Sequence, residues 1–233
     1  MNDFPRALCA LVLAATTGIA GAGSDPGVLL DATFNGEPLD QQIGTGGAEF
    51  GQPVSIFPGL SAIVRAAPLP TPSLEFSHAS SGTARHARFE FLGSEEVNHG
   101  DLDIRVRIEA AQFDGFDVDV REQGTSAQSF LSLTFTGFGD IASSDENGSL
   151  GVIGSYSVGV VHQLTLLFHL DDGTYDIDLD GVSLVSGRAH GVTARGIGSV
   201  LLGTGTLTAP GSLFYVGRLR VTRGDGVFHD GFD

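Results

Sequence analysis

The sequence predicts an all-β protein folded as a two-sheet antiparallel sandwich of the jelly-roll class. Glycine is frequent, at 34 of 233 residues. Apolar residues recur with period two in several segments, which is the period of a strand, and no segment of helical length shows the 3.6-residue period of a helix. We therefore expect about twelve short strands joined by glycine-containing turns, because this pattern is typical of sandwiches and jelly rolls.

Alternation of side chains predicts the central strands. Residues 102–108 alternate Leu, Ile and Val with charged side chains, so one face of this strand is expected in a core and the other in water. Residues 116–121 and 131–136 alternate in the same way. Between the first two segments stands Asp114-Gly115, which predicts a hairpin turn, since glycine readily adopts the positive φ that tight turns require.

The segment 164–184 predicts three consecutive antiparallel strands. Two Asp-Gly pairs, at 172–173 and 180–181, separate runs in which apolar and polar residues alternate. The proline-rich run 68–72 interrupts regular structure and predicts a loop between two strands.

Residues 1–22 have the order of a secretory signal peptide, with Arg6 in a polar start, an apolar run over 7–15 and small residues ending at Ala22. We expect cleavage after Ala22 and a secreted, periplasmic or cell-surface location. Cys9 lies within this segment, so the mature protein would have no thiol and would depend on its core rather than on disulfides. No later segment reaches the roughly 20 apolar residues of a membrane span, so we expect no membrane-spanning segment after residue 22.

The rest of the chain is expected to form a single β-sandwich domain over 23–223, followed by a tail over 224–233. Removal of residues 1–22 leaves 211 residues (233 minus 22), which is within the range of one large sandwich. No linker, composition shift or internal repeat divides this stretch.

The charge of the chain is strongly acidic, at −16, and all of its 12 basic residues are arginines. Such a chain repels nucleic acid and anionic membrane surfaces, so neither is an expected partner. Solubility explains the same charge without any partner. The oligomeric state does not follow from the sequence.

Residues 156–185, YSVGVVHQLTLLFHLDDGTYDIDLDGVSLV, resemble the laminin G-like members of the concanavalin A-like lectin and glucanase superfamily. The opening segment 29–34 with Gly36 and the closing strand over 213–221 add to the resemblance, since such folds bring the first and last strands together. The resemblance extends over 28–223 and implies a jelly-roll fold whose commonest ligands are glycans. It is a resemblance of fold, and fold alone does not give function.

The C-terminal sequence GVFHDGFD is similar to a short F-x-D-G-F-[ED] tail found on many exported proteins of Xanthomonas- and Lysobacter-like bacteria. That similarity implies a sorting or surface-retention signal. The alternative is an untethered acidic terminus.

Asp117, Asp119 and Glu122 have the spacing of the E-x-D-x-x-E motif of laminarinase-type glycoside hydrolases. In that family the first carboxylate is the nucleophile and the last is the general acid, and the two are held about 5 Å apart. The resemblance implies the same roles for Asp117 and Glu122. Here the first position is a shorter Asp, and the chain contains no Trp to stack on a sugar ring. The alternative is an amphipathic strand with aspartates on its solvent face.

Two acidic groups are candidates for calcium. Asp176, Asp178 and Asp180 alternate along one strand, but successive members lie about 6.8 Å apart, which is too far for one ion, and solvated edge charges explain them better.

The second group is Asp145, Glu146 and Asn147, in a loop before Gly148. Calcium is therefore a possible ligand, and no other cofactor is expected.

Three functions remain open. The first is a non-catalytic module that binds a polysaccharide or cell-surface glycan through Asn, Asp, Arg and main-chain groups on loops. The alternative is a glycoside hydrolase or polysaccharide lyase on the same scaffold, for which Asp117, Asp119 and Glu122 are the supporting residues. A structural envelope protein without a ligand is the third.

Overall fold

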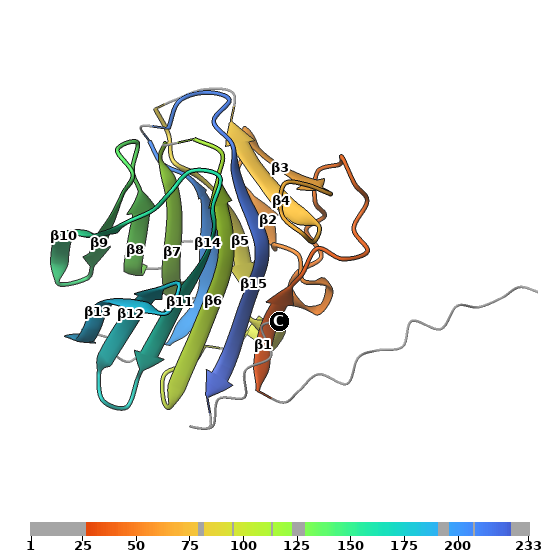
Figure 1. Cartoon of the computed structure of the whole chain (residues 1–233). Helices are drawn as coiled ribbons and strands as arrows, with labels where there is room; N and C mark the ends of the chain where they lie inside the picture. Colours follow the sequence, from red (N-terminus) through yellow and green to blue (C-terminus); the bar gives the residue numbers. More distant parts are fainter. Residues whose placement is uncertain are drawn as a thin grey trace, which may run out of the picture.

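The computed structural model describes residues 27–78, 82–94, 96–112, 114–122, 129–190, 196–206 and 208–224. The predicted signal peptide with Cys9, and the tail beyond residue 224, lie outside the described residues. The described part forms two stacked antiparallel sheets, which confirms the predicted all-β sandwich (Figure 1). Two short 3-10 turns, η1 (Ala48–Phe50) and η2 (Leu92–Ser94), complete the regular structure.

Sheet A has eight strands, all paired in the antiparallel sense. Its long central strands β11, β6 and β15 lie at the front of Figure 1. In spatial order the strands are β13 (Val182–Ala189), β12 (Thr174–Leu179), β11 (Val161–His169), β6 (Asp101–Ala110), β15 (Phe214–Gly224), β4 (Ser73–His78) and β3 (Leu60–Arg65), with β1 (Val28–Ala32) paired to β15.

Sheet B has seven strands, also antiparallel, and lies behind sheet A in the same view. In spatial order they are β10 (Gly148–Ser155), β9 (Asp140–Asp145), β8 (Ser129–Phe135), β7 (Phe116–Glu122), β14 (Ile197–Thr204), β5 (Arg85–Glu90) and β2 (Ser55–Ile56).

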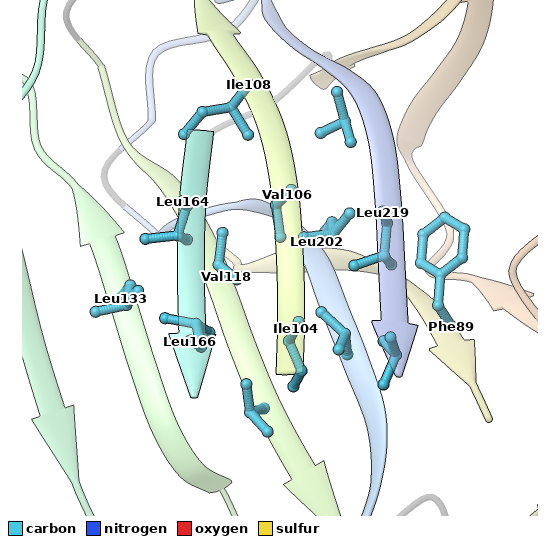
Figure 2. Packing of buried hydrophobic residues seen from close by; sticks show 14 of the residues in the cluster. Phe89, Ile104, Val106, Ile108, Val118, Leu133, Leu164, Leu166, Leu202 and Leu219 are labelled. Carbon is cyan, nitrogen blue, oxygen red and sulfur yellow. The ribbon is translucent and has the colours of Figure 1, made fainter. Parts of the chain in front are cut away.

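The core fills the space between the sheets with the apolar half of each alternating strand (Figure 2). Ile104, Val106 and Ile108 of β6 are 0–1 % exposed, which confirms the predicted inward face of this strand. Val118 of β7 and Leu202 of β14 project from the opposite sheet. Full burial of one such side chain stabilises a fold by about 1.5–3 kcal/mol, so this layer can hold the domain together without disulfides.

Several predictions about how the strands are connected and paired are confirmed. β11, β12 and β13 are consecutive antiparallel neighbours, and Gly173 and Gly181 at their turns have φ of 66° and 75°. β1 pairs with β15, so the first and last strands do meet. The proline-rich run 68–72 forms a connection between β3 and β4.

The predicted hairpin at Asp114-Gly115 is wrong. β6 belongs to sheet A and β7 to sheet B, so this pair carries the chain from one sheet to the other. Gly115 does not take a positive φ, and its carbonyl accepts a hydrogen bond from Thr208. The Asp114 carboxylate accepts bonds from the Ser212 hydroxyl and from the Ala209 amide, the latter at 2.9 Å. The turn residues therefore anchor a crossover, which local sequence does not distinguish from a hairpin.

Candidate functional site

The face of sheet B that points away from the core carries polar side chains on β5 and β7, on either side of β14. On β7, Val118 and Val120 enter the core, so Asp117 and Asp119 between them point outward. Phe89 of β5 and Leu202 of β14 also enter the core, so the residues that precede and follow each of them along the strand point outward. We call this surface the sheet-B outer face, with His86 and Arg88 of β5, Leu201 and Gly203 of β14, and Asp117, Asp119 and Arg121 of β7.

The strand register arranges these residues in two rows. In the first, Gly203 pairs with His86 on one side and with Asp117 on the other, and Asp117 pairs with Thr134 of β8. Phe57 extends this row beyond His86, because its amide donates to the His86 carbonyl at 2.9 Å and its ring is 49 % exposed.

In the second row, Leu201 lies between Arg88 and Asp119, and Asp119 pairs with Ser132. Opposed residues on an antiparallel pair project to the same side, so each row brings its side chains together on one surface.

Asp119 is the most unusual residue of this face. It is 4 % exposed although it points away from the core. Its Oδ2 accepts a hydrogen bond from Arg121 at 2.7 Å, whereas Oδ1 is buried and has no hydrogen-bond partner among the described residues. Nε2 of His86 is likewise buried and has no hydrogen-bond partner among the described residues. A buried polar atom left without a partner costs about 1–3 kcal/mol, so such atoms indicate strain or a missing ligand.

The protonation of the face follows from its burial. Desolvation raises the pKa of Asp117 from its ordinary 3.8 to about 6, with a smaller rise from the charge of Asp119, and the bond from Thr134 at 2.8 Å opposes the shift. Desolvation lowers the pKa of His86, against the attraction of Asp119. Perturbed acids and bases gathered on one surface are typical of functional sites, although ion-pair networks also produce them.

Gly203 is required between the two titratable groups of the first row. A Cβ at this position would stand 1.9 Å from the Arg85 carbonyl oxygen, which is backbone and cannot move aside cheaply. The row therefore has no side chain between His86 and Asp117.

The structure brings together two of the three predicted catalytic carboxylates. Asp117 and Asp119 share the sheet-B outer face. Glu122 stands two residues after the core residue Val120 on β7 and pairs with Ile197, another core residue, so its side chain lies on the core side of the sheet. Catalysis by this triplet stays a prediction, since its third member faces away from the other two.

The predicted calcium residues Asp145, Glu146 and Asn147 lie at the turn between β9 and β10. Asp145 joins the two sheets, because its Oδ2 accepts from the Tyr175 hydroxyl at 2.9 Å and from Arg188 at 3.1 Å. Its Oδ1 accepts from the Asn147 amide at 2.8 Å. A calcium ion would have to compete with all three donors, and calcium at this turn stays a prediction.

The expected position of Asp176, Asp178 and Asp180 at the edge of a sheet is wrong. β12 lies between β11 and β13, so it is not an edge strand. Asp176 accepts from the Gly187 amide at 2.6 Å and contacts His169 at 3.2 Å, while Asp180 contacts His162 at 2.7 Å. These two side chains act in local hydrogen bonding.

A shallow pocket at one end of the sandwich is lined by Asp114, Thr208, Ser212 and Phe214 among others. The Ser212 hydroxyl donates to Asp114, and the nearby His78 places Nε2 3.1 Å from the Thr208 carbonyl. An activated serine needs a base to accept its proton, and an imidazole placed in this way does not do so for Ser212.

Two further observations concern the described residues alone. No three His, Cys, Asp or Glu side chains among them are grouped to hold a metal ion. None of the helical segments in this part of the chain is long and apolar enough to cross a membrane.

His86, Arg88 and Gly203 are not predicted as site residues from the sequence. A signal was present in the run Arg85 to Glu90, where polar and apolar residues alternate as they do on β7. Strand pairing between β5, β14 and β7 was needed to show that these residues join Asp117 and Asp119.

Comparison with known proteins identifies the fold. No family model matches the chain, and no curated protein matches its sequence. A solved sialidase is similar over 70 % of this chain and 16 % of its own length, with 12 % identity and a TM-score of 0.53. A mutant sialidase from Trypanosoma rangeli with trans-sialidase activity is similar over 84 % and 31 %, with 12 % identity and a TM-score of 0.56.

A carbohydrate esterase from the Shiga toxin-encoding bacteriophage phi24B is similar over 85 % of this chain and 99 % of its own, with 11 % identity and a TM-score of 0.54. The chain thus spans about a sixth to a third of the length of the sialidases and nearly all of the esterase. At these identities the similarity shows the fold alone, and the chain shares the β-sandwich of these solved proteins.

Proposed function

We propose that this chain is an exported, non-catalytic module that binds a polysaccharide or cell-surface glycan on the sheet-B outer face. Sugar hydroxyls both donate and accept hydrogen bonds, so they suit a surface on which carboxylates, an imidazole and guanidinium groups alternate. Phe57 offers an exposed ring at the end of the same row, against which the apolar face of a sugar ring could pack. The shared fold with proteins named as a sialidase and a carbohydrate esterase supports a sugar ligand.

The Asp119 carboxylate is the observation that carries the proposal. Its Oδ1 is buried on an outward face and has no donor among the described residues, while Oδ2 is held by Arg121. A sugar O–H reaching this oxygen would supply the missing donor, and a charge-assisted bond of this kind is about twice as strong as a neutral one. The proposed site lies on strand faces rather than on the loops where we expected it.

A second candidate is glycoside hydrolysis or polysaccharide cleavage at the same surface. Its support is the difference between two neighbouring carboxyls: the pKa of Asp117 is raised to about 6 by burial, whereas Asp119 is held by Arg121. Acid–base cleavage of a glycosidic bond uses two carboxyls in different environments, one of which holds its proton more strongly than usual, as the raised pKa of Asp117 favours. In this candidate Asp117 is the general acid and Asp119 the base, without Glu122.

A glycan array probed with the mature chain, with and without calcium, tests both candidates. We expect binding to at least one oligosaccharide, reduced at least tenfold by Asp119→Asn and unchanged by Asp178→Asn. The control removes a carboxylate from the outward side of β12 in sheet A, so it matches the change in charge. A reducing-end assay on the same glycans separates the candidates, since release that Asp117→Asn abolishes supports the enzyme.

Two results would overturn these candidates. Absence of both binding and release across the array would remove both. Equal losses of binding in Asp119→Asn and Asp178→Asn would move the site away from Asp119. Thermal unfolding of each variant distinguishes a lost site from a lost fold.

Export has its own test. Expression of the full chain in a bacterial host should place the protein outside the cytoplasm, with a mass that begins after Ala22. An intact N-terminus on cytoplasmic protein would contradict export.

A further inference from the structure

Asp117 is a carboxylate on the sheet-B outer face that has no ion pair with a cation among the described residues. Its Oδ1 accepts a hydrogen bond from the neutral Thr134 hydroxyl at 2.8 Å. The charge that acts on it is that of Asp119, which is also negative. A Cβ built on Gly205 would stand 3.2 Å from its Oδ2, so backbone lies against the other side of the carboxylate. Asp117 is therefore a half-buried anion whose charge is left uncompensated in the described part of the chain.

Asp119, two residues further along β7, is a second carboxylate that is incompletely satisfied. It is 4 % exposed, and Arg121 holds its Oδ2 at 2.7 Å. Its Oδ1 is buried and has no donor among the described residues. Asp117 thus lacks a positive charge and Asp119 lacks a hydrogen-bond donor. Alternation places both side chains on the same surface.

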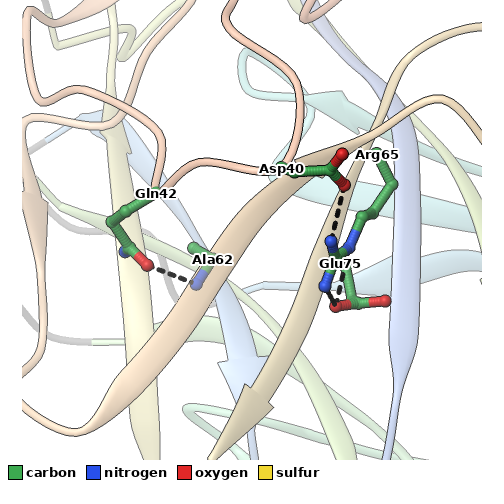
Figure 3. A network of polar contacts seen from close by, with 5 residues as sticks. All are labelled: Asp40, Gln42, Ala62, Arg65 and Glu75. Atoms are coloured by element: carbon green, nitrogen blue, oxygen red, sulfur yellow. Dashed lines mark hydrogen bonds and ion pairs between the residues drawn. The ribbon is translucent and has the colours of Figure 1, made fainter.

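The acids beside Arg65 on sheet A show how this protein satisfies carboxylates for structural purposes. Figure 3 shows the guanidinium of Arg65 between two carboxylates, 2.7 Å from Asp40 and 2.8 Å from Glu75. The bonds to Glu75 and Asp40 raise the pKa of Arg65 well above its ordinary value, so the charges stabilise one another. A cation with this role is missing at Asp117 within the described residues.

Folding does not explain a carboxylate at position 117. Burial, with a smaller contribution from the charge of Asp119, raises the pKa of Asp117 to about 6, so the folded state disfavours its ionised form. An asparagine would keep an oxygen for the Thr134 hydroxyl and would avoid the buried charge. A perturbed carboxyl of this kind is typical of a group that is retained for a ligand.

The surroundings of Asp117 do not oppose a cationic ligand. Burial lowers the pKa of His86, on the far side of Gly203, so this imidazole is neutral at pH 7. The two arginines of the face already contact carboxylates, Arg121 with Asp119 at 2.7 Å and Arg88 with Glu90 at 3.0 Å. The net charge of the whole chain is −16, which attracts cations over a long range.

We propose that the glycan bound on the sheet-B outer face is an amino-sugar polymer, whose ammonium groups pair with Asp117 and Asp119. This inference rests on the proposed function and names the class of its ligand. An ammonium is a compact positive charge with three donors, so it supplies both the charge that Asp117 lacks and the donor that Asp119 lacks. A sugar hydroxyl supplies only the donor.

The length of the row suits an oligosaccharide rather than a single sugar. Phe57 stands three strand spacings from Asp117, with β5 and β14 between them, which is about 14 Å. Its exposed ring offers an apolar surface for a sugar ring at one end, while the two carboxylates hold an ammonium at the other.

Titration calorimetry with three tetrasaccharides of the same β-1,4 linkage tests the inference. Their units are glucosamine, N-acetylglucosamine and glucose, so they differ only in an amine, an acetamide or a hydroxyl at one ring carbon. Near pH 6.5 Asp117 is mostly ionised. A sugar amine resembles an α-amino group, with a pKa of about 7.7–8.0, and is mostly charged at that pH. We expect glucosamine to bind at least tenfold more tightly than either neutral sugar, with an affinity that falls as salt increases.

Asp117→Asn should weaken binding of the glucosamine tetramer at least tenfold and remove its advantage over glucose, because the pairing charge is lost. Asp178→Asn removes a carboxylate from the outward side of β12 in sheet A and should leave the affinity unchanged. The thermal unfolding of both variants verifies that they are folded. Tetralysine carries ammonium groups without a sugar and should bind at least tenfold more weakly than the glucosamine tetramer.

The failures of this inference and of the proposed function are distinguishable. If glucose or N-acetylglucosamine binds as tightly as glucosamine, the glycan site stands and the ammonium is wrong. If none of the three binds and the glycan array yields another ligand, the amino sugar alone is wrong. Equal binding of tetralysine, or an equal loss in Asp178→Asn, would show a general attraction of the acidic chain for cations and would overturn the inference.

Discussion

The outer faces of the two sheets look alike in sequence and differ in how their charges are satisfied. On sheet A, His169 lies between Asp101 and Asp176, and Arg218 is held by Asp31. Each face has one carboxylate with a buried oxygen that lacks a donor among the described residues, Asp103 on sheet A and Asp119 on sheet B. Sheet B adds Asp117, whose pKa is raised to about 6 by burial. Alternation places polar residues on both faces, so only burial and partners distinguish a face that is largely closed by its own ion pairs from one that is strained. We expect that difference to appear in stability as well as in binding.

The largest expected difference comes from one glycine on each face. Gly203→Ala would place a Cβ 1.9 Å from the Arg85 carbonyl oxygen, whereas Gly217→Ala would meet only the tip of Leu69 at 2.8 Å. Backbone cannot yield as a side-chain tip can, so we expect a loss of about 3 kcal/mol or more for Gly203→Ala and about 1 kcal/mol for Gly217→Ala. Urea denaturation measures both. Equal losses would mean that the close packing at Gly203 is not as described.

Removal of one carboxylate charge should change the free energy of unfolding in opposite directions on the two faces. The pKa of Asp117 is raised from 3.8 to about 6, so its contribution is favourable at low pH and is lost as pH rises from about 4 to 6. Asp117→Asn should therefore stabilise the fold by about 2–3 kcal/mol at pH 8 and have little effect near pH 3.5. Asp31→Asn breaks the pair with Arg218 and should destabilise it by about 0.5–1 kcal/mol at pH 8. Urea denaturation of both variants at pH 3.5 and pH 8 measures these effects. A loss of stability in Asp117→Asn at pH 8 would contradict an unfavourable buried charge at Asp117.

The smallest expected effect concerns two histidines. The bond to Asp101, followed by that to Asp176, raises the pKa of His169 above its ordinary 6.5, so its stabilisation is present below pH 6.5 and is lost as pH rises through the raised value. Burial lowers the pKa of His86, so the folded state loses stability as pH falls below 6.5.

Substitution of each histidine by glutamine should therefore act in opposite senses at pH 5. His169→Gln should lower stability relative to the unmodified protein, and His86→Gln should raise it, each by no more than about 1 kcal/mol. The stability difference for His86→Gln should shrink by pH 8. The difference for His169→Gln should shrink only at a higher pH, because its pKa is raised. Melting temperatures across this range give the two slopes, and slopes of the same sign would contradict the assigned environments.

Most of the fold could be predicted because its signals are local. Alternation over 102–108 and the Asp-Gly turns near 172 and 180 gave the central strands and their order. The outcome at Asp114-Gly115 shows the limit of this reasoning. A turn pair determines that the chain turns, whereas membership of a sheet depends on pairings between strands far apart in sequence, such as β7 with β14.

The candidate site could be predicted only in part for the same reason. Asp117 and Asp119 stand out from their spacing, but His86 and Gly203 join them through pairing across β14. Glu122 stands two residues after the core residue Val120, so alternation along β7 already places it on the core side, and this could have been predicted from the sequence. Burial of Asp119 on an outward face also depends on the assembled structure.

Backbone-amide NMR with an oligosaccharide selected from the glycan array tests the central claim most directly. We predict that the resonances that shift on titration cluster on β5, β14 and β7, at His86, Gly203, Asp117 and Asp119. Asp119→Asn should abolish these shifts while leaving the remaining spectrum in place. Shifts confined to sheet A, with β5, β14 and β7 unchanged at saturation, would contradict a glycan site on the outer face of sheet B.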